Sequence, residues 1–371
     1  MKQEKDNLNI IYIGRYNESE NLSGPEKAAK RIFTEHSKTH KTNFIQYFFD
    51  GRKYSLWQKL FGKDKNQISG NAVIYTLGLF KVLSVLRKIR PNIIHIITFE
   101  RFAAVLLLYK LFNRTKIIYN AHGIIAYEDY ELKNVPFFHK LKDKICERLY
   151  INKSDKIIFM SENSIDIAEK YFKVKESKSI ILANGIDDVF NIKPIGKINA
   201  PLKAVLIYRN ELCRSGVNFL NKALKSIEKD FEQLELFVIS NENIDIENKN
   251  VHFIKPMDTV QLVDFYRDKD VFLSLNRYDT FSISTAEAMA SGLIPIVTKQ
   301  TGISRYIEDG YNGFTVDYDD TKGLCEIINK VIKLNSEERK TISQSAAVIY
   351  ESLSWNSVYE TYYNIYSQMA K

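Results

Sequence analysis

The chain has 371 residues, of which 45% are hydrophobic and 26% are charged. This composition is typical of globular proteins, and at roughly 150 residues per domain the length predicts two domains. No run approaches the ~18 apolar residues of a membrane span, and the sequence predicts no signal peptide. The three cysteines are far apart, which excludes an obvious disulfide framework or metal motif and favours a reducing, cytoplasmic compartment.

Charge is distributed unevenly along the chain, whose formal net charge is +8. Residues 1–185 contain 32 Lys and Arg against 19 Asp and Glu, whereas the remainder contains 21 against 26. A basic first half predicts an anionic partner for that half. No recognised nucleic-acid-binding motif accompanies the charge. Anionic lipid headgroups or a phosphorylated acceptor therefore fit better than nucleic acid.

The first half begins with a predicted strand, a loop and a helix. Residues 8–13 form an apolar run that predicts a buried parallel strand, and the helix is predicted over 26–39. After a strand over 44–49, residues 52–65 mix five basic residues with Tyr54, Trp57 and Phe61. This mixture suits an anionic membrane interface. The alternative is a solvated loop whose aromatic rings cover the core.

A histidine follows one of the next strands. Apolar runs predict strands over 73–75, 93–98 and 116–120, with a helix over 79–89. The last of these strands leads directly to His122. Because parallel sheets bind ligands at the carboxyl ends of their strands, His122 is a candidate site residue. The alternative is a structural histidine that bonds the loop backbone.

A turn and a linker end the first half. A basic helix is predicted over 137–152, with strands over 156–160 and 179–182. The sequence Asn184-Gly185-Ile186-Asp187 follows, and Gly185 is expected to supply the positive φ of a tight turn. Residues 191–201, with two prolines and a glycine, predict the linker.

The second half starts the alternation again with a strand over 204–208. Arg209 follows this strand, and Arg214 precedes a Ser-Gly pair and a helix from Val217. Two arginines at this point supply fixed positive charge with bidentate hydrogen-bonding capacity. Solvated arginines in a surface loop are the alternative. Further strands are predicted over 234–239, 251–254 and 271–275.

The most informative stretch runs from Asp279 to Thr298. Small residues lead from Asp279 into a short helix that carries Glu287 and ends before an apolar strand over 294–297. Free N–H groups at a helix start hold phosphate, and a carboxylate one or two turns inside can accept hydrogen bonds from vicinal sugar hydroxyls. The alternative is a helix start rich in capping residues. Later acids at 187–188 and 317–320 are interpreted as turn and cap residues rather than metal ligands.

These motifs, in this order, resemble the retaining glycosyltransferases of family 4, which have the GT-B fold. The resemblance covers most of the chain and rests on the acidic-x7-Glu pattern of Asp279 and Glu287, the following Ala-Met-Ala-Ser-Gly, the Asn-Gly-Ile-Asp turn and the arginine pair. Three positions depart from the family pattern. Asp279 replaces the usual Glu, Tyr208 replaces a Gly, and Arg305 replaces an acid.

The resemblance implies an α/β fold with two Rossmann-like domains facing across a cleft. Residues 1–190 would form the acceptor-binding domain and residues 201–350 the nucleotide-sugar-binding domain. Residues 351–371 would form a helix, predicted over 355–369, that crosses back onto the first domain. It also implies chemistry without a metal or a cofactor other than the nucleotide-sugar co-substrate.

The resemblance also implies roles for individual residues. His122, Asp279 and Glu287 would be catalytic, with His122 and Asp279 at the donor sugar and Glu287 at the ribose. Ser23 and Gly24 would lie in a cleft loop near the acceptor, although an ordinary strand-to-helix turn is the alternative. The donor would be bound by Asn184, Arg209, Arg214, Phe281, Ser282, Ile283, Ser284, Thr285 and Glu287.

The implied function is transfer of a hexose, with retention, from a UDP-type donor to a glycan or lipid-linked acceptor in bacterial surface polysaccharide assembly. The enzyme would be cytoplasmic, with peripheral contact to anionic membrane through its basic first domain. The three departures leave a catalytically degenerate subunit, binding donor or lipid without turnover, as an alternative. A sugar-nucleotide epimerase shares the two-domain fold but not the acidic-x7-Glu stretch or the arginine pair.

Overall fold

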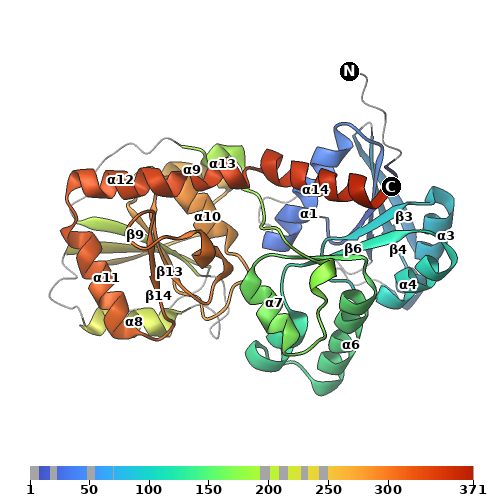
Figure 1. Ribbon diagram of the computed structural model, residues 1–371, viewed down its shortest axis with the longest axis horizontal. Helices are drawn as coiled ribbons and strands as arrows, with labels where there is room; N and C mark the ends of the chain where they lie inside the picture. The colour runs from blue at the N-terminus through green and yellow to red at the C-terminus, as the bar shows by residue number, and fades with distance from the viewer. Residues whose placement is uncertain are drawn as a thin grey trace. The chain divides into compact units, whose positions relative to one another are not determined.

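The computed structural model describes residues 8–16, 23–47, 55–69, 71–192, 201–208, 216–226, 233–241 and 250–370. The chain divides into two compact units (Figure 1). Unit 1 consists of Met1–Ala183 and Val358–Lys371, and unit 2 consists of Asn184–Ser357. Each unit contains a predominantly parallel sheet with helices, which confirms the predicted fold class.

The sheet of unit 1 has the strand order β3-β4-β2-β1-β5-β6-β7-β8 within the described residues. All neighbouring pairs are parallel except β3 with β4. The central strands are apolar and buried, as expected for a sheet covered on both faces. The strands are β1 (Ile10–Ile13), β2 (Thr42–Tyr47), β3 (Lys63–Ser69), β4 (Ala72–Leu77), β5 (Ile93–Ile96), β6 (Lys116–Ala121), β7 (Lys156–Phe159) and β8 (Ser179–Ile181).

Helices connect these strands, and α3, α4 and α6 pack side by side. A short π-helical turn, Glu128–Leu132, and a 3-10 turn, Glu176–Lys178, complete the connections. The helices are α1 (Gly24–Ser37), α2 (Leu56–Phe61), α3 (Leu79–Ile89), α4 (Ala103–Phe112), α5 (Ile125–Tyr127), α6 (Phe137–Lys153), α7 (Glu162–Glu169) and α14 (Trp355–Ala370), which joins unit 1 from Val358 onward. Helix α14 lies beside α1, where His36 Nδ1 is 2.7 Å from the Tyr359 hydroxyl (Figure 1).

A buried polar network fixes α14 to the sheet of unit 1. Tyr362 and Tyr366 are almost inaccessible to solvent. The Tyr366 hydroxyl donates to His95 Nδ1 at 2.7 Å, and His95 Nε2 donates to Asn120 Oδ1 at 2.9 Å. Asn120 Nδ2 in turn donates to the Tyr362 hydroxyl at 2.7 Å. Because every member has a partner, the network specifies the position of α14 without leaving these buried polar groups unpaired.

Three histidines of unit 1 whose ring nitrogens are inaccessible to solvent make its stability depend on pH. Burial lowers the pKa of His95 to about 4, and burial together with neighbouring histidines lowers the pKa of His36 and of His122 to about 3. The unfolded chain binds these protons near pH 6.5 and the folded chain does not. The free energy of unfolding should therefore fall as the pH drops below about 6.5 toward 3.

Two buried carboxyl groups act in the opposite direction. Burial raises the pKa of Glu100 to about 7 and that of Glu147 to about 8, so the stability they contribute is lost as the pH rises through these values. We therefore expect maximal stability near pH 6–7, measured by urea unfolding across pH 4–9. His36→Gln should reduce the proton uptake on unfolding below pH 6 by about one. An unchanged slope in this variant would contradict the assignment.

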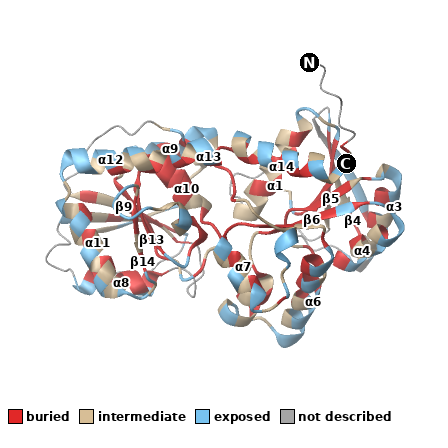
Figure 2. Cartoon of the chain, viewed as in Figure 1, coloured by how far each residue is buried: buried red, intermediate tan, exposed pale blue. Residues whose placement is uncertain are grey.

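The sheet of unit 2 has the order β11-β10-β9-β12-β13-β14 within the described residues, and all neighbouring pairs are parallel. Its strands are β9 (Leu202–Ile207), β10 (Leu234–Ile239), β11 (Val251–Ile254), β12 (Val271–Ser274), β13 (Ile294–Thr298) and β14 (Phe314–Val316). Its helices are α8 (Val217–Ser226), α9 (Thr259–Tyr266), α10 (Ile283–Ala290), α11 (Thr321–Lys333), α12 (Ser336–Ala347) and α13 (Ile349–Leu353), with 3-10 turns at Asp188–Phe190 and Gly302–Tyr306. Figure 2 shows the buried strands of this sheet between more exposed helices.

The stretch 52–65 differs from the expectation of a loop. Its described part contains α2 and the start of β3, an antiparallel edge strand that the sequence did not reveal. The residues of β3 lack apolar alternation and include Lys63 and Lys65, as is common for edge strands that must not pair with another chain. In α2, Trp57 is 66% exposed and does not cover the core, whereas Phe61 stacks on Phe80.

Candidate functional site

The loop between β12 and α10 of unit 2 carries the Asp279 motif. It leaves the carboxyl end of a parallel strand, the edge at which such sheets bind ligands. Asp279 forms an isolated parallel bridge with Thr301, and Gly302 N donates to the Asp279 carbonyl at 2.8 Å. The segment that departs from the family pattern at Arg305 is therefore attached to this loop. Arg305 itself is exposed, with its guanidinium over the Tyr306 ring.

The Asp279 carboxylate organises its own loop. Its Oδ1 accepts hydrogen bonds from the backbone N–H groups of Phe281 and Ser282, both at 3.1 Å. This is a short-range turn that an aspartate can make to residues two and three positions on. Within the described residues, no hydrogen-bond partner accompanies Oδ2. A contact between this oxygen and a sugar hydroxyl remains a prediction.

Helix α10 begins in an unusual backbone conformation. Ser282, the residue before the helix, has φ 70° and ψ 77°, a left-handed conformation that is uncommon for a residue with a side chain. Its hydroxyl lies 2.7 Å from Thr285 Oγ1, and no side chain within the described residues caps the helix. The N–H groups of Ile283, Ser284 and Thr285 form the first turn, which is the arrangement that binds anions.

Glu287 lies in the second turn of α10. Its side chain is only 3% exposed, and the helix is buried from Thr285 to Ala290. Burial of a carboxylate costs free energy unless polar groups contact it. A buried glutamate beside an anion-binding helix start therefore indicates a polar binding site rather than part of the hydrophobic core. Phe281, by contrast, is buried with its ring edge-to-face against Tyr306.

Gly216, which follows the arginines in the sequence, lies close to the start of this loop. Gly216 has φ +58°, and a Cβ at this position would overlap the Leu275 carbonyl, with the carbonyl carbon at 2.6 Å. The chain entering α8 therefore lies against the end of β12. Residues 209–215, including Arg209 and Arg214, lie outside the described residues. Their flanking residues, Tyr208 after β9 and Gly216 beside β12, are both at the carboxyl edge of the sheet.

The 3-10 turn Asp188–Phe190 packs on α10, and Ser291 Oγ, directly after this helix, donates to the Phe190 carbonyl at 3.3 Å. Asn184 is 5% exposed, and its buried Oδ1 has no partner within the described residues, which is consistent with a ligand contact. The positive φ expected at Gly185 is wrong. The absence of a side chain matters for another reason, because the ring of Trp355 occupies the place of a Cβ.

His122 follows β6 in unit 1 and is half-buried, although both of its ring nitrogens are inaccessible. Its lowered pKa, caused mainly by burial, keeps the imidazole neutral at physiological pH. Helix α6 holds the following segment, since Glu147 accepts hydrogen bonds from Ile125 N and Ala126 N at 2.9 and 2.8 Å. Sequence reasoning missed Glu147, which no motif distinguishes.

Ser23 and Gly24 are also in unit 1, at the start of α1, which begins two residues earlier than predicted. The Ser23 N–H and hydroxyl both donate to Glu26 Oε2, at 3.0 and 2.6 Å. In this structure Ser23 therefore belongs to a helix cap. Its predicted acceptor contact stays a prediction.

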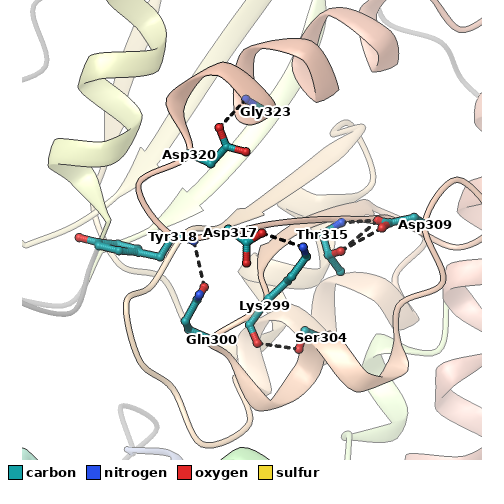
Figure 3. A network of polar contacts seen from close by, with 9 residues as sticks. All are labelled: Lys299, Gln300, Ser304, Asp309, Thr315, Asp317, Tyr318, Asp320 and Gly323. Atoms are coloured by element: carbon teal, nitrogen blue, oxygen red, sulfur yellow. Dashed lines mark hydrogen bonds and ion pairs between the residues drawn. The ribbon is translucent and has the colours of Figure 1, made fainter.

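The acids near β14 are structural (Figure 3). Asp317 Oδ2 is 2.8 Å from Lys299 Nζ, and Asp320 caps α11 by accepting from Gly323 N at 3.0 Å. Asp309 accepts from the N–H and hydroxyl of Thr315. Asp320 is therefore a cap, as interpreted, whereas Asp317 and Asp319 pair with Lys299 and Lys222. Within the described residues no group of three or more His, Cys, Asp or Glu is arranged to hold a metal ion.

Comparisons with known proteins agree with this architecture. Residues 191–348 match the family model "Glycosyl transferases group 1", and residues 66–190 match "Glycosyltransferase Family 4". An uncharacterised glycosyltransferase of Methanocaldococcus jannaschii is 24% identical over 62% of this chain and 65% of its own length, just under two thirds. An uncharacterised protein from the cps region of Klebsiella pneumoniae is 22% identical over 74% of this chain and 78% of its own.

Among solved structures, Anabaena HepE in complex with UDP and glucose has a similar fold. Its TM-score is 0.72 at 16% identity, and the alignment covers 97% of this chain and 99% of HepE. The family models and this fold together define the chain as a glycosyltransferase with the GT-B fold. The chain is thus an enzyme, and these matches do not favour the alternative of a non-catalytic subunit.

Proposed function

We propose that the chain is a retaining, family 4 hexosyltransferase that uses a UDP-sugar donor. The observation that carries this proposal is the start of α10, where no side chain among the described residues caps the first turn and Glu287 lies buried beside it. The turn offers N–H groups to the diphosphate, and Glu287 accepts the ribose hydroxyls. The UDP and glucose in the HepE complex support the choice of donor.

Transfer requires stabilisation of the departing diphosphate. We assign this to Arg209, Arg214 and the α10 amides, whose positive charge and fixed dipoles would take up the developing negative charge without a metal ion. Asp279 would hold a sugar hydroxyl through Oδ2. His122 would contact the sugar as a neutral imidazole, which can donate and accept a hydrogen bond.

The proposed acceptor is a glycan or a lipid-linked glycan in bacterial surface polysaccharide assembly, handled in the cytoplasm at the inner face of the membrane. The Klebsiella relative from a cps region supports this context. The excess of basic residues in the first half supports an anionic acceptor or membrane surface.

The test is a thermal-shift screen of UDP- and GDP-sugars, followed by NMR analysis of the anomeric configuration of the product. A UDP-sugar should raise the midpoint most, and an α-linked donor should give an α-linked product. A β-linked product would refute retention. Stabilisation by GDP-sugars alone would refute the donor assignment.

A further inference from the structure

Helix α6 separates its charges by sign. Its acids face inward: Asp143 makes a bidentate pair with Arg101 at 2.6 and 2.8 Å, and Glu147 accepts two backbone amides. Both acids are at most 3% exposed. The exposed charged residues of the helix, in contrast, are Lys142, Arg148 and Lys153, all cationic.

The outer face of α6 is also unusually apolar. Phe138, Leu141 and Ile145, spaced i, i+3 and i+7, are 81%, 40% and 52% exposed, and Phe137 at the helix start is 65% exposed. These positions form one stripe on a helix. Lys142 and Arg148 lie along the same stripe. The face therefore presents phenyl and aliphatic groups together with cations, and no carboxylate.

The neighbouring helix α4 extends this surface. It packs against α6, and its outward positions Leu108, Leu111 and Phe112, spaced i, i+3 and i+4, are 46%, 77% and 81% exposed. Its one charged residue, Lys110, is bonded to Asp155 at 2.6 Å. A helix that is apolar all round is normally buried. The outer side of α4 is instead exposed, although its sequence is typical of a buried helix.

We propose that the exposed residues of α4 and α6, here the α4–α6 face, dock on an anionic lipid surface. Apolar side chains combined with cations are what the boundary between headgroups and acyl chains accommodates. The exposed charged side chains of α6 are all cationic. A protein partner whose surface carries both signs of charge would place some of its own cations against them, whereas an anionic lipid surface would not. This proposal rests on the proposed function, because it supplies a route to a lipid-linked acceptor.

The placement of α6 fits this role within unit 1. The helix follows β6 and precedes the parallel strand β7, so its first residues lie toward the carboxyl edge of the sheet. His122 stands at the same edge, directly after β6. A membrane docked at Phe137 and Phe138 would therefore lie on the side of unit 1 where ligands are expected.

The experiment is co-sedimentation of the full chain with vesicles of phosphatidylcholine, alone or mixed with phosphatidylglycerol. The wild type should bind the mixed vesicles, and binding should weaken with salt. Phe137→Ser with Phe138→Ser should reduce binding at least about tenfold. Lys142→Gln should reduce it roughly fivefold on mixed vesicles and leave binding to neutral vesicles unchanged. The control replaces Val260 and Tyr311 of unit 2, which are 67% and 56% exposed, by serine.

Four outcomes would overturn the proposal. The wild type could fail to prefer anionic vesicles, or the Phe137/Phe138 double variant could bind as well as wild type. Loss of vesicle binding in Trp57→Ser alone would show that the membrane contact is made by α2 and not by the α4–α6 face. A wild-type dimer in sedimentation velocity that the double variant abolishes would show that a second copy covers the face. Since the exposed phenyls are not packed in the core, unchanged thermal unfolding should confirm that the variants fold.

Failure of this proposal is distinguishable from failure of the proposed function. UDP-sugar binding with no vesicle binding would refute the lipid surface alone. Vesicle binding without stabilisation by any UDP-sugar would refute the donor assignment and leave the lipid contact in place.

Discussion

Replacing Glu287 by alanine is expected to weaken UDP binding and kcat/KM by about thirtyfold or more. The residue is buried in the second turn of α10, where a carboxylate can accept the two ribose hydroxyls. Hydrogen bonds to a charged group of this kind contribute about 2–3 kcal/mol. Calorimetry with UDP and initial-rate kinetics measure the loss. The matched control is Glu326→Ala on the exposed side of α11, which should bind UDP like the wild type.

A nucleotide analogue sharpens this prediction. The wild type should bind 2′,3′-dideoxy-UDP about thirtyfold more weakly than UDP, and the Glu287→Ala variant should bind the two equally, as in a double-mutant cycle. If the variant still prefers UDP by the same factor, the carboxylate does not contact the ribose. Thermal unfolding of the variant without nucleotide separates a loss of binding from a loss of folding.

Replacing Gly216 by alanine should destabilise unit 2 by about 3 kcal/mol. The left-handed conformation costs a residue with a Cβ about 1–2 kcal/mol. The overlap with the Leu275 carbonyl adds about 1–3 kcal/mol, because backbone must move. Gly310→Ala is the matched control, since Gly310 also has a positive φ of +80° but its nearest neighbour, Lys330 Nζ, is 3.8 Å from the added carbon.

Urea unfolding followed by fluorescence measures both glycine variants. In a Trp57→Phe background, Trp355 is the one remaining tryptophan, and it is buried in unit 2. The Gly216 variant should lose about twice the stability that the Gly310 variant loses. Equal losses would show that the contact with Leu275 relaxes freely and that only the backbone conformation matters.

The fold class followed from the sequence because apolar runs alternate with amphipathic segments in both halves. Strands such as β5, β6, β9 and β13 are mostly apolar, as is typical of a parallel sheet buried on both faces. Strand β3 was missed because it is polar and lies at the edge of its sheet, where no apolar pattern is needed. Its pairing with β4 is a tertiary property that local sequence does not encode.

The site was predictable as a stretch but not in its geometry. The spacing of Asp279 and Glu287 located the loop and helix, since small residues before a helix indicate its start. That Asp279 would use one oxygen to bond Phe281 N and Ser282 N depends on the left-handed backbone at Ser282, which a serine gives no reason to expect. Gly185 was misinterpreted because its neighbour Trp355 is far away in sequence.

The two units differ in the order in which their residues are translated. Unit 2 is one uninterrupted stretch, Asn184–Ser357, whereas unit 1 needs Tyr362 and Tyr366 to complete the core around His95. Nascent domains begin to fold as soon as they emerge. Most of unit 1 is translated before unit 2, but its core is completed only when Tyr362 and Tyr366 have been translated after unit 2. We therefore expect unit 1 to reach its final packing only after unit 2 has been synthesised.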